Sequence, residues 1–490
     1  MTKPGEKLIL SYSDTNAKGE GISPAYLIGS IRSLYPKLEI EGGAGVRPHK
    51  NSINNYCYPE NPEAGIDLFL EKLVQETEKE HEDILEQADE TDAMFGELYS
   101  WYLRNPEYRS RVQKLVQSAF AGKPEDIISQ SVAKALYGEV SPYSATRLER
   151  FAACAFAHFL QYGMKLTERV EYEFKPMDMG NVMHEALESF AEEVRKRGMK
   201  WTELTEQERN EIADRCLDNI VADYGNTVLK SSARNEYMIE RTRRILRRTV
   251  WALQKQLEQG EFQPEGFEVT FGGGRIDRVD IMEDQNKVYV KVIDYKTGNT
   301  SFDLVYLYHG LQLQLMIYLD GALRVEQKKY PDKEIIPAGV FYYNIKDPMI
   351  QEKIDADVEA VSAGLMKELK MNGLVQADPE LVYRMDSSLG SIPVAFNKDG
   401  SFRKNSSVAD RTQFAVLGRY VRTKIEKIRS SILEGDAEVS PYELGKKNAC
   451  TYCPYMTVCG FDRRLSGYEF RRLKNFSDEE LWKVFDREAE

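Results

Sequence analysis

Two stretches in the second half of the sequence are arranged to pair with each other, and this pairing constrains the fold more than any other feature. Residues 274–280 (Gly-Arg-Ile-Asp-Arg-Val-Asp) and 292–298 (Val-Ile-Asp-Tyr-Lys-Thr-Gly) flank a polar turn around residues 285–286. A hairpin centred on that turn places Asp277 directly opposite Asp294, because the register of a hairpin follows from its turn. The sequence therefore predicts two antiparallel strands with two carboxylates side by side.

Facing carboxylates suggest a site for a cation. Cross-strand Cβ atoms lie roughly 4.5–5.5 Å apart, and two carboxylates at that distance repel unless a positive charge lies between them. Lys296 shares the face of Asp294, whereas Tyr295 points the other way and Asp280 lies on the opposite face from Asp277. Oxygen ligands for Mg²⁺ or Mn²⁺ beside a lysine are what phosphodiester hydrolysis requires. The alternative is a group of solvated charges at a sheet edge, but an apolar strand ending in Asp-Tyr-Lys favours the metal site.

The surrounding pattern predicts a three-layer α/β core in the order helix, three strands, helix, strand. Residue 144 is expected to cap a helix that runs to residue 160, after a boundary near residues 138–144. The other predicted elements are helical residues 179–258, strands 266–272, 275–282 and 287–295, a long helix 304–327 and a strand 335–343. Upstream, we expect a strand at residues 8–12 and helices at 62–78 and 84–103.

Composition narrows the class of protein. A chain of 490 residues with 42% hydrophobic residues can bury large cores. Its apolar runs, such as residues 311–319, are too short to span a bilayer, and the N-terminus lacks a signal-peptide pattern, so we expect a soluble cytoplasmic protein without a membrane partner. The formal charge of −13 describes the average surface and leaves room for a local basic groove that binds nucleic acid. No G-x-x-x-x-G-K-[ST] phosphate loop occurs in the sequence.

Several polar side chains are candidates to join the carboxylates. His184 lies beside an apolar helical stripe, where a histidine is either structural or, if the carboxylates are close, a ligand. Gln314 and Tyr318 are separated by one helical turn and can both contact Lys296 or a DNA phosphate, although helix packing explains their spacing equally well. Residues 241–248 contain five arginines; Arg241, Arg244 and Arg248 are candidate contacts to the DNA backbone, the alternative being a solvated face.

Four cysteines form a candidate metal centre. Cys450, Cys453 and Cys459 follow C-x₂-C-x₅-C spacing, and Cys154 is the best donor of a fourth ligand. A group bound to all four would hold both ends of the core together. By analogy with cross-link entropy, that closure would contribute on the order of 5 kcal/mol. Spacing alone leaves [4Fe–4S] and zinc open, and the remaining Cys57 and Cys216 are interpreted as ordinary thiols.

In combination these stretches resemble the B subunit of bacterial AddAB/RexAB ATP-dependent helicase–nucleases. They occur in that family's order and span nearly everything from residue 141 to residue 462. The resembling stretches are residues 141–154 (SPYSATRLERFAAC), 179–186 (MGNVMHEA), 274–280 and 293–298, Gln314 with Tyr318, and the cysteine triplet at 450–459.

The resemblance implies an α/β fold with a PD-(D/E)xK, restriction-endonuclease-like nuclease core of the RecB type and flanking helices. It implies a DNA exonuclease that cuts the 5′-terminated strand during double-strand break repair by homologous recombination, with an AddA-type helicase/nuclease as partner. The implied site consists of metal ligands His184, Asp277 and Asp294, catalytic Lys296, Gln314 and Tyr318, and a [4Fe–4S] cluster on Cys154, Cys450, Cys453 and Cys459.

Length sets this chain apart from the family, whose members carry a long helicase-like region. We expect residues 1–140 to be the C-terminal part of such a region, 141–465 to form the nuclease domain and 466–490 a polar tail, so the chain is expected to be a fragment or a truncated gene product. Two alternatives are a stand-alone exonuclease similar to CRISPR-associated RecB-type nucleases and a non-catalytic DNA-binding scaffold. The intact Asp277, Asp294 and Lys296 argue against the scaffold.

Overall fold

A computed structural model describes ten segments of the chain, which belong to two compact units, residues Met1–Phe120 and Ala121–Glu490. The described residues are 26–37, 62–78, 90–119, 127–138, 144–167, 176–223, 232–272, 274–350, 357–465 and 467–489. The expected strand at residues 8–12 and Cys57 lie outside these segments.

Within the described residues, the first unit contains four helices. They are α1 (Tyr26–Leu34), α2 (Pro62–Glu78), α3 (Glu90–Arg104) and α4 (Pro106–Ala119). The helix predicted at 62–78 is confirmed as α2, and the helix predicted at 84–103 is confirmed as α3 from residue 90 onward, since residues 84–89 lie outside the described segments. Phe69 lies at the centre of a small core, where its ring stacks on Phe95 at 4.6 Å between centroids. None of the sequence-predicted site residues belongs to this unit.

The second unit is built on a six-stranded mixed sheet. Its strands follow one another in sequence order, and only the β3–β4 and β5–β6 pairs are parallel. The strands are β1 (Gln263–Phe271), β2 (Gly274–Asp284), β3 (Lys287–Lys296), β4 (Glu334–Asn344), β5 (Asn372–Gln376) and β6 (Val408–Ala409). The four predicted strands are confirmed as β1 to β4. A right-handed helical crossover is the usual way to connect parallel neighbours such as β3 and β4.

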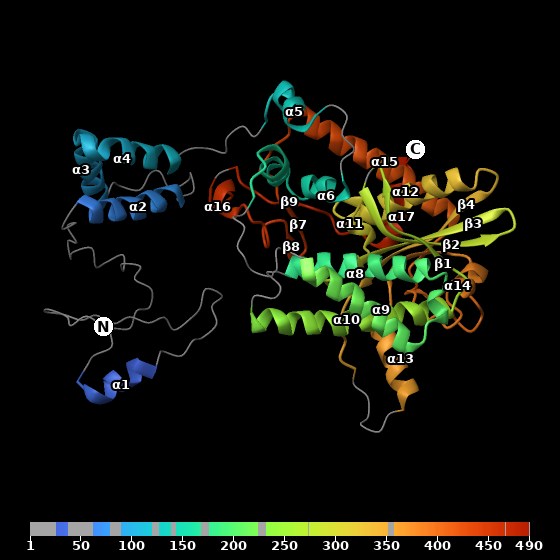
Figure 1. Ribbon diagram of the computed structural model, residues 1–490. Coiled ribbons are helices and arrows are strands. Elements are labelled where there is room, and N and C mark those ends of the chain that lie inside the picture. The colour runs from blue at the N-terminus through green and yellow to red at the C-terminus, as the bar shows by residue number, and fades with distance from the viewer. Residues whose placement is uncertain are drawn as a thin grey trace. The chain divides into compact units, whose positions relative to one another are not determined.

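Helices cover both faces of this sheet and make the predicted three layers (Figure 1). One face packs on α8 (Pro176–Lys196), α9 (Glu206–Asp223) and α10 (Ala233–Glu258), with side chains such as Ile293 and Tyr295 in the core. The other face packs on α6 (Ala145–Ala153), α12 (Gln314–Lys329), α15 (Arg411–Glu434) and α17 (Asp478–Ala489), with Val290 and Val292 in the core. Odd-numbered residues of β3 therefore face one layer of helices and even-numbered residues face the other, so Asp294 and Tyr295 point to opposite faces of the sheet.

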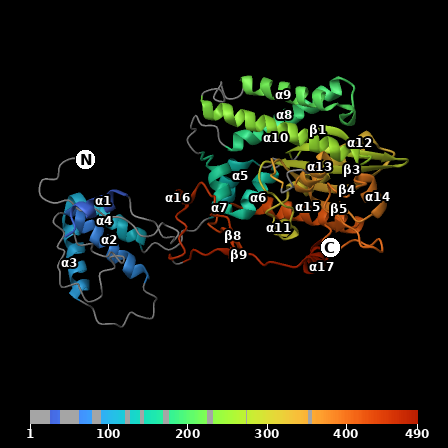
Figure 2. The ribbon, with the colours of Figure 1, turned by 90° about the horizontal axis from the view of Figure 1, so that it is seen from below.

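Smaller elements complete the second unit, and Figure 2 shows β8, β9 and α16 grouped near α6 and α7. They are α5 (Gln130–Tyr137), α7 (Ala155–His158), a π-helical turn (Phe159–Gly163), a 3₁₀ turn (Trp201–Glu203), α11 (Leu304–Tyr308), α13 (Val358–Glu368), α14 (Pro379–Met385), β7 (Tyr442–Leu444), β8 (Lys447–Asn448), α16 (Met456–Cys459) and β9 (Arg471–Arg472). In the described part of the chain, no helix is both long and apolar enough to cross a bilayer.

Two predicted helices are interrupted, and the predictions of continuous helices were wrong. The helix expected at 304–327 is divided into α11 and α12, because Gly310 adopts a left-handed φ of +79° between them. Ser144 does cap α6, accepting a hydrogen bond from the N–H of Arg147, but α6 ends where Cys154 becomes extended (φ −165°). Both breaks lie at candidate site residues, because α12 begins at Gln314 and Cys154 follows the last residue of α6.

Candidate active site

Three carboxylates lie in a row across β1, β2 and β3. The β2–β3 pairing runs in the predicted register, which puts Asp277 beside Asp294. The β1–β2 pairs on either side of Glu268 put that residue beside Asp277. Asp277 and Asp294 are buried, and Oδ2 of Asp277 accepts a hydrogen bond of 2.7 Å from the N–H of Tyr295. Three acidic side chains therefore lie close together in a part of the protein with little access to solvent.

Glu268 is the site residue that the sequence analysis missed. Its backbone adopts a φ of +50°, which is uncommon for a residue with a side chain and occurs often at functional sites. The carboxylate is only 6% exposed and forms an ion pair with Arg275. A signal was present in the glycines at 272–274, because a β1–β2 register counted from that turn leads to Glu268 opposite Asp277.

His184 reaches the carboxylates from α8. Its Nδ1 lies 3.4 Å from Oδ2 of Asp277 and 3.9 Å from Oε1 of Glu268. Its ring packs edge-on against Tyr295, with 6.1 Å between centroids. Because proximity to the carboxylates was the condition for treating this histidine as a ligand, the geometry favours that interpretation over a purely structural one.

The electrostatics of this cluster call for a cation. Burial alone would lower the pKa of His184, but hydrogen bonds to Asp277 and Glu268 outweigh it and raise that pKa to about 10. Burial, followed by the charge of Asp277, raises the pKa of Asp294 to about 7 even though Lys296 opposes the shift. Ligand atoms of His184, Glu268 and Asp277 all lie within 4.8 Å of one another. These side chains therefore fit a divalent cation. Without a cation, bound protons reduce the negative charge of the cluster, and a bound cation would do so in their place.

Lys296 is held in place by a chain of polar contacts that starts on α12. Its Nζ lies 2.7 Å from Oδ2 of Asp294 and donates a 2.7 Å hydrogen bond to Oε1 of Gln314. Nε2 of Gln314 in turn donates to the hydroxyl oxygen of Tyr318 at 2.9 Å. Gln314 thus contacts Lys296 directly and Tyr318 contacts Gln314, and this chain of contacts orients the ammonium toward the carboxylates.

Glu149, on α6, fixes the start of α12. Its Oε1 accepts hydrogen bonds from the N–H groups of Leu313 and Gln314, at 2.7 and 3.0 Å. Burial raises the pKa of Glu149 to about 7, while the two N–H groups and Lys296 oppose the shift. These bonds satisfy helix donors that otherwise have no partner, and α12 has no cap from its own side chains. Glu149 therefore sets the position of Gln314.

Asp280 belongs to a separate structural cluster on the other face of the sheet, as its predicted orientation requires. It is fully buried between Arg278, whose Nε lies 2.6 Å away, and Lys291, whose Nζ lies 2.8 Å away. Arg278 also lies over the rings of Trp201 and Phe267, at 5.6 and 5.7 Å from their centroids. This buried triad links β2 and β3 directly behind the carboxylate row.

The arginines of α10 are distributed among different contacts. Arg241 is exposed, Arg244 pairs with Asp347 at 2.7 Å, and the guanidinium of Arg248 lies 5.6 Å from the ring centroid of Trp251. The two arginines between them, at positions 243 and 247, form ion pairs with aspartates of α9. Much of the charge of this run is thus neutralised within the protein.

The four cysteines converge although about 300 residues separate Cys154 from the triplet. Cys154, Cys450, Cys453 and Cys459 line one small cavity. Burial, followed by the neighbouring thiol groups, raises the pKa of Cys450 to about 11. Thiols kept protonated by their surroundings would ionise on binding a metal, so the donor set fits a thiolate-bound metal centre.

A row of carboxylates beside a histidine, with a lysine two residues after the last aspartate of a strand pair, defines the class as an α/β nuclease core. A family model described as the PD-(D/E)XK nuclease superfamily matches residues 142–460, and the chain belongs to this superfamily. The predicted PD-(D/E)xK fold class is thereby confirmed. The matched range includes all of the candidate site residues described in this subsection.

Relatives with curated names align along the whole chain. Three of them, from Lachnoclostridium phytofermentans, Alkaliphilus metalliredigens and Thermoanaerobacter sp., are 39%, 32% and 30% identical to it. Each is named as the B subunit of an ATP-dependent helicase/deoxyribonuclease, which supports the resemblance drawn from the sequence motifs. The match covers 100% of this chain and 43–44% of each relative, so the chain spans less than half the length of these proteins.

Proposed function

We propose that this chain is the nuclease portion of the B subunit of an AddAB-type helicase–nuclease, and that it hydrolyses phosphodiester bonds of DNA. The observation that carries the proposal is the convergence of His184, Glu268, Asp277 and Asp294 next to Lys296. The names of the relatives support a DNA substrate and a partner protein, for which an AddA-type helicase/nuclease is the candidate. Cleavage of the 5′-terminated strand follows from the family resemblance.

His184, Asp277 and Asp294, with Glu268 as a further candidate, would hold Mg²⁺ or Mn²⁺. When bound, such a cation supplies Lewis acidity and lowers the pKa of a water molecule. The ammonium of Lys296, fixed by Asp294 and Gln314, is placed to orient the attacking water and to offset charge that develops on the phosphate. Water oxygen bonds to phosphorus, the bond to the leaving oxygen breaks, and that oxygen takes up a proton.

The four cysteines would hold a [4Fe–4S] cluster with a structural role. The supporting observation is that all four thiols line one small cavity. The family resemblance supports [4Fe–4S] at this site, and zinc is the alternative that the cysteine spacing leaves open. Arg241, Arg244 and Arg248 stay candidate contacts to the DNA backbone.

The test compares the wild-type chain with Lys296→Ala, both purified without oxygen, on end-labelled linear DNA with Mg²⁺. We expect cleavage by wild type only, with the visible absorption of an iron–sulfur cluster in both proteins. A brown, folded wild-type protein that cuts nothing, even with the helicase partner added, would contradict the proposal. Activity of the chain without that partner would instead support a stand-alone exonuclease.

A further inference from the structure

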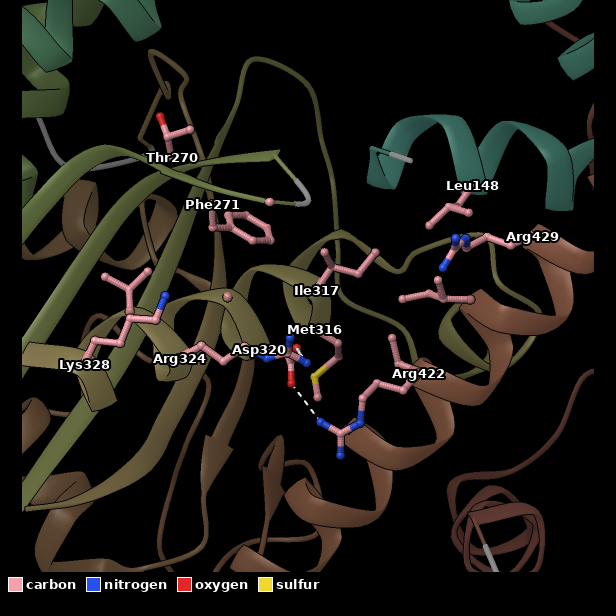
Figure 3. A pocket seen from close by; sticks show the side chains of 16 residues that line it. Leu148, Thr270, Phe271, Met316, Ile317, Asp320, Arg324, Lys328, Arg422 and Arg429 are labelled. Atoms are coloured by element: carbon pink, nitrogen blue, oxygen red, sulfur yellow. Dashed lines mark hydrogen bonds and ion pairs between the residues drawn. The ribbon is translucent and has the colours of Figure 1, made fainter. Parts of the chain in front are cut away.

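A second hollow opens beside the active site, between α12, α15 and the end of β1 (Figure 3). Its volume is about 550 Å³, which is enough for a nucleotide-sized group. Its floor is apolar and comes from all three elements. The main floor residues are Phe271, Met316, Ile317, Val421 and Ile425.

Four cationic side chains surround this floor. Arg324 and Lys328 come from α12, and Arg422 and Arg429 come from α15. A single carboxylate, Asp320, lines the same hollow. On a chain whose formal charge is −13, four cations against one carboxylate mark a local patch of the opposite sign.

Asp320 forms ion pairs with two of these cations and holds their side chains in place, without neutralising the whole patch. Its Oδ1 lies 2.8 Å from Nη1 of Arg422 and its Oδ2 lies 2.7 Å from Nη2 of Arg324. One carboxylate therefore fixes two guanidinium groups from different helices, and both remain more than half exposed. Arg429 pairs with Glu426, whereas Lys328 is exposed and takes part in no ion pair within the described part of the chain.

The hollow is connected to the active site through Phe271 and α12. The ring of Phe271 packs edge-on against Tyr318, with 5.9 Å between centroids. Since an α-helix rises about 1.5 Å per residue, Arg324 and Lys328 lie roughly 9 and 15 Å beyond Tyr318 along the axis. These cations are too far away to act on the reacting phosphate, but they suit phosphates further along the same strand.

We propose that this hollow binds the backbone of single-stranded DNA next to the phosphate being cut, an inference that rests on the proposed nuclease function. A cationic rim over an apolar floor with an aromatic ring is the chemistry that single strands use, because phosphates meet the rim and an unstacked base covers the floor. A duplex keeps its bases stacked inside and would leave the floor uncovered.

The experiment measures binding of a fluorescein-labelled oligothymidylate to the full 490-residue chain by anisotropy, in EDTA and between about 50 and 200 mM salt. The test variant is Lys328→Ala with Arg422→Ala. The matched control is Arg419→Ala with Lys427→Ala, which removes one arginine and one lysine from exposed positions of α15 outside the hollow. Lys328→Glu is a second test variant, since this side chain is exposed.

We expect the test variant to bind roughly tenfold more weakly and the control to bind like wild type. The slope of log affinity against log salt should fall by about 1.4 in the test variant, because each lost contact to a single-strand phosphate removes about 0.7. Equal weakening in both variants, or weakening with an unchanged slope, overturns the proposal. Equal weakening of duplex binding overturns the assignment to single strands. Binding in EDTA does not depend on cleavage, so this experiment tests DNA binding at the hollow even if the chain proves to have no nuclease activity.

Discussion

Replacing Asp294, a proposed metal ligand, by asparagine should stabilise the cation-free protein near neutral pH. Burial and then Asp277 raise the pKa of Asp294 from 3.8 to about 7, with Lys296 opposing. At about 1.4 kcal/mol per pKa unit, ionising this buried group costs the fold about 4 kcal/mol above pH 7. Asparagine keeps the shape without the charge, so we expect a gain of about 2–4 kcal/mol near pH 8 in EDTA.

The pH dependence of this gain has a definite sign. A carboxyl whose folded pKa is raised holds its proton more tightly in the folded protein, so the wild type loses stability as the pH rises from about 4 to about 7. Asp294→Asn should therefore be similar to wild type near pH 4 and most favourable above pH 7. Excess Mg²⁺ should reverse the order, because a cation bound to the folded wild type stabilises it.

The matched control is Asp280→Asn, on the neighbouring strand. Burial alone would raise the pKa of Asp280, but Arg278 and Lys291 overcome it and lower that pKa. Removing this charge leaves two buried cations without their partner, which should destabilise the protein by about 3–5 kcal/mol. Two buried aspartates changed in the same way should thus shift the free energy of unfolding in opposite directions.

The assay is denaturant unfolding of the three proteins followed by circular dichroism, at several pH values, with the midpoint and slope fitted for the transition of the second unit. Asp294→Asn should also abolish DNA cleavage. Destabilisation by Asp294→Asn near pH 8 in EDTA, or a gain that is equally large near pH 4, would refute the electrostatic reasoning.

Three further changes test other parts of the site. Cys154→Ser should remove the visible chromophore and lower the free energy of unfolding by about 5 kcal/mol, measured by denaturant titration; retention of both would contradict a cluster at this cysteine. Glu149→Ala should reduce kcat on labelled DNA at least tenfold by releasing the start of α12, and unchanged kcat with unchanged pH profile would exclude a positioning role. Gly321→Ala should lower stability by about 1–3 kcal/mol, because a Cβ would lie 2.6 Å from the ring of Phe271; a neutral melting temperature would show that the ring moves aside.

Local rules were enough to predict the centre of the site. Turn polarity and strand alternation determine the β2–β3 register, and that register brings Asp277, Asp294 and Lys296 together. Glu268 was missed because only the β2–β3 turn was used to set a register, whereas the glycine turn at residues 272–274 places Glu268 opposite Asp277. Local rules also gave one long helix where Gly310 makes a break, since periodicity shows the apolar stripe but not a change in backbone direction.

Contacts between residues far apart in the sequence were beyond these rules. The arginine run of α10 gave no sign that Arg244 would pair with Asp347, about 100 residues later. Nor did the sequence show that Glu149 would fix the start of α12, about 160 residues away. Tertiary packing determines such partners. The role of an arginine run or of a single glutamate therefore cannot be decided from the sequence before the fold is known.

The separation of Cys154 from the other three cysteines has a consequence during synthesis. Cys154 leaves the ribosome about 300 residues before Cys450, a delay of roughly 15–60 s at ordinary elongation rates. The sheet and the helices that pack on it, except α17, can form during that interval, while the cavity lined by Cys154, Cys450, Cys453 and Cys459 cannot close. A nascent chain that stops before the triplet can therefore contain every strand of the six-stranded sheet and still lack the contacts between Cys154 and the triplet. We expect such a truncated chain to be less stable and therefore to be degraded by cellular proteases.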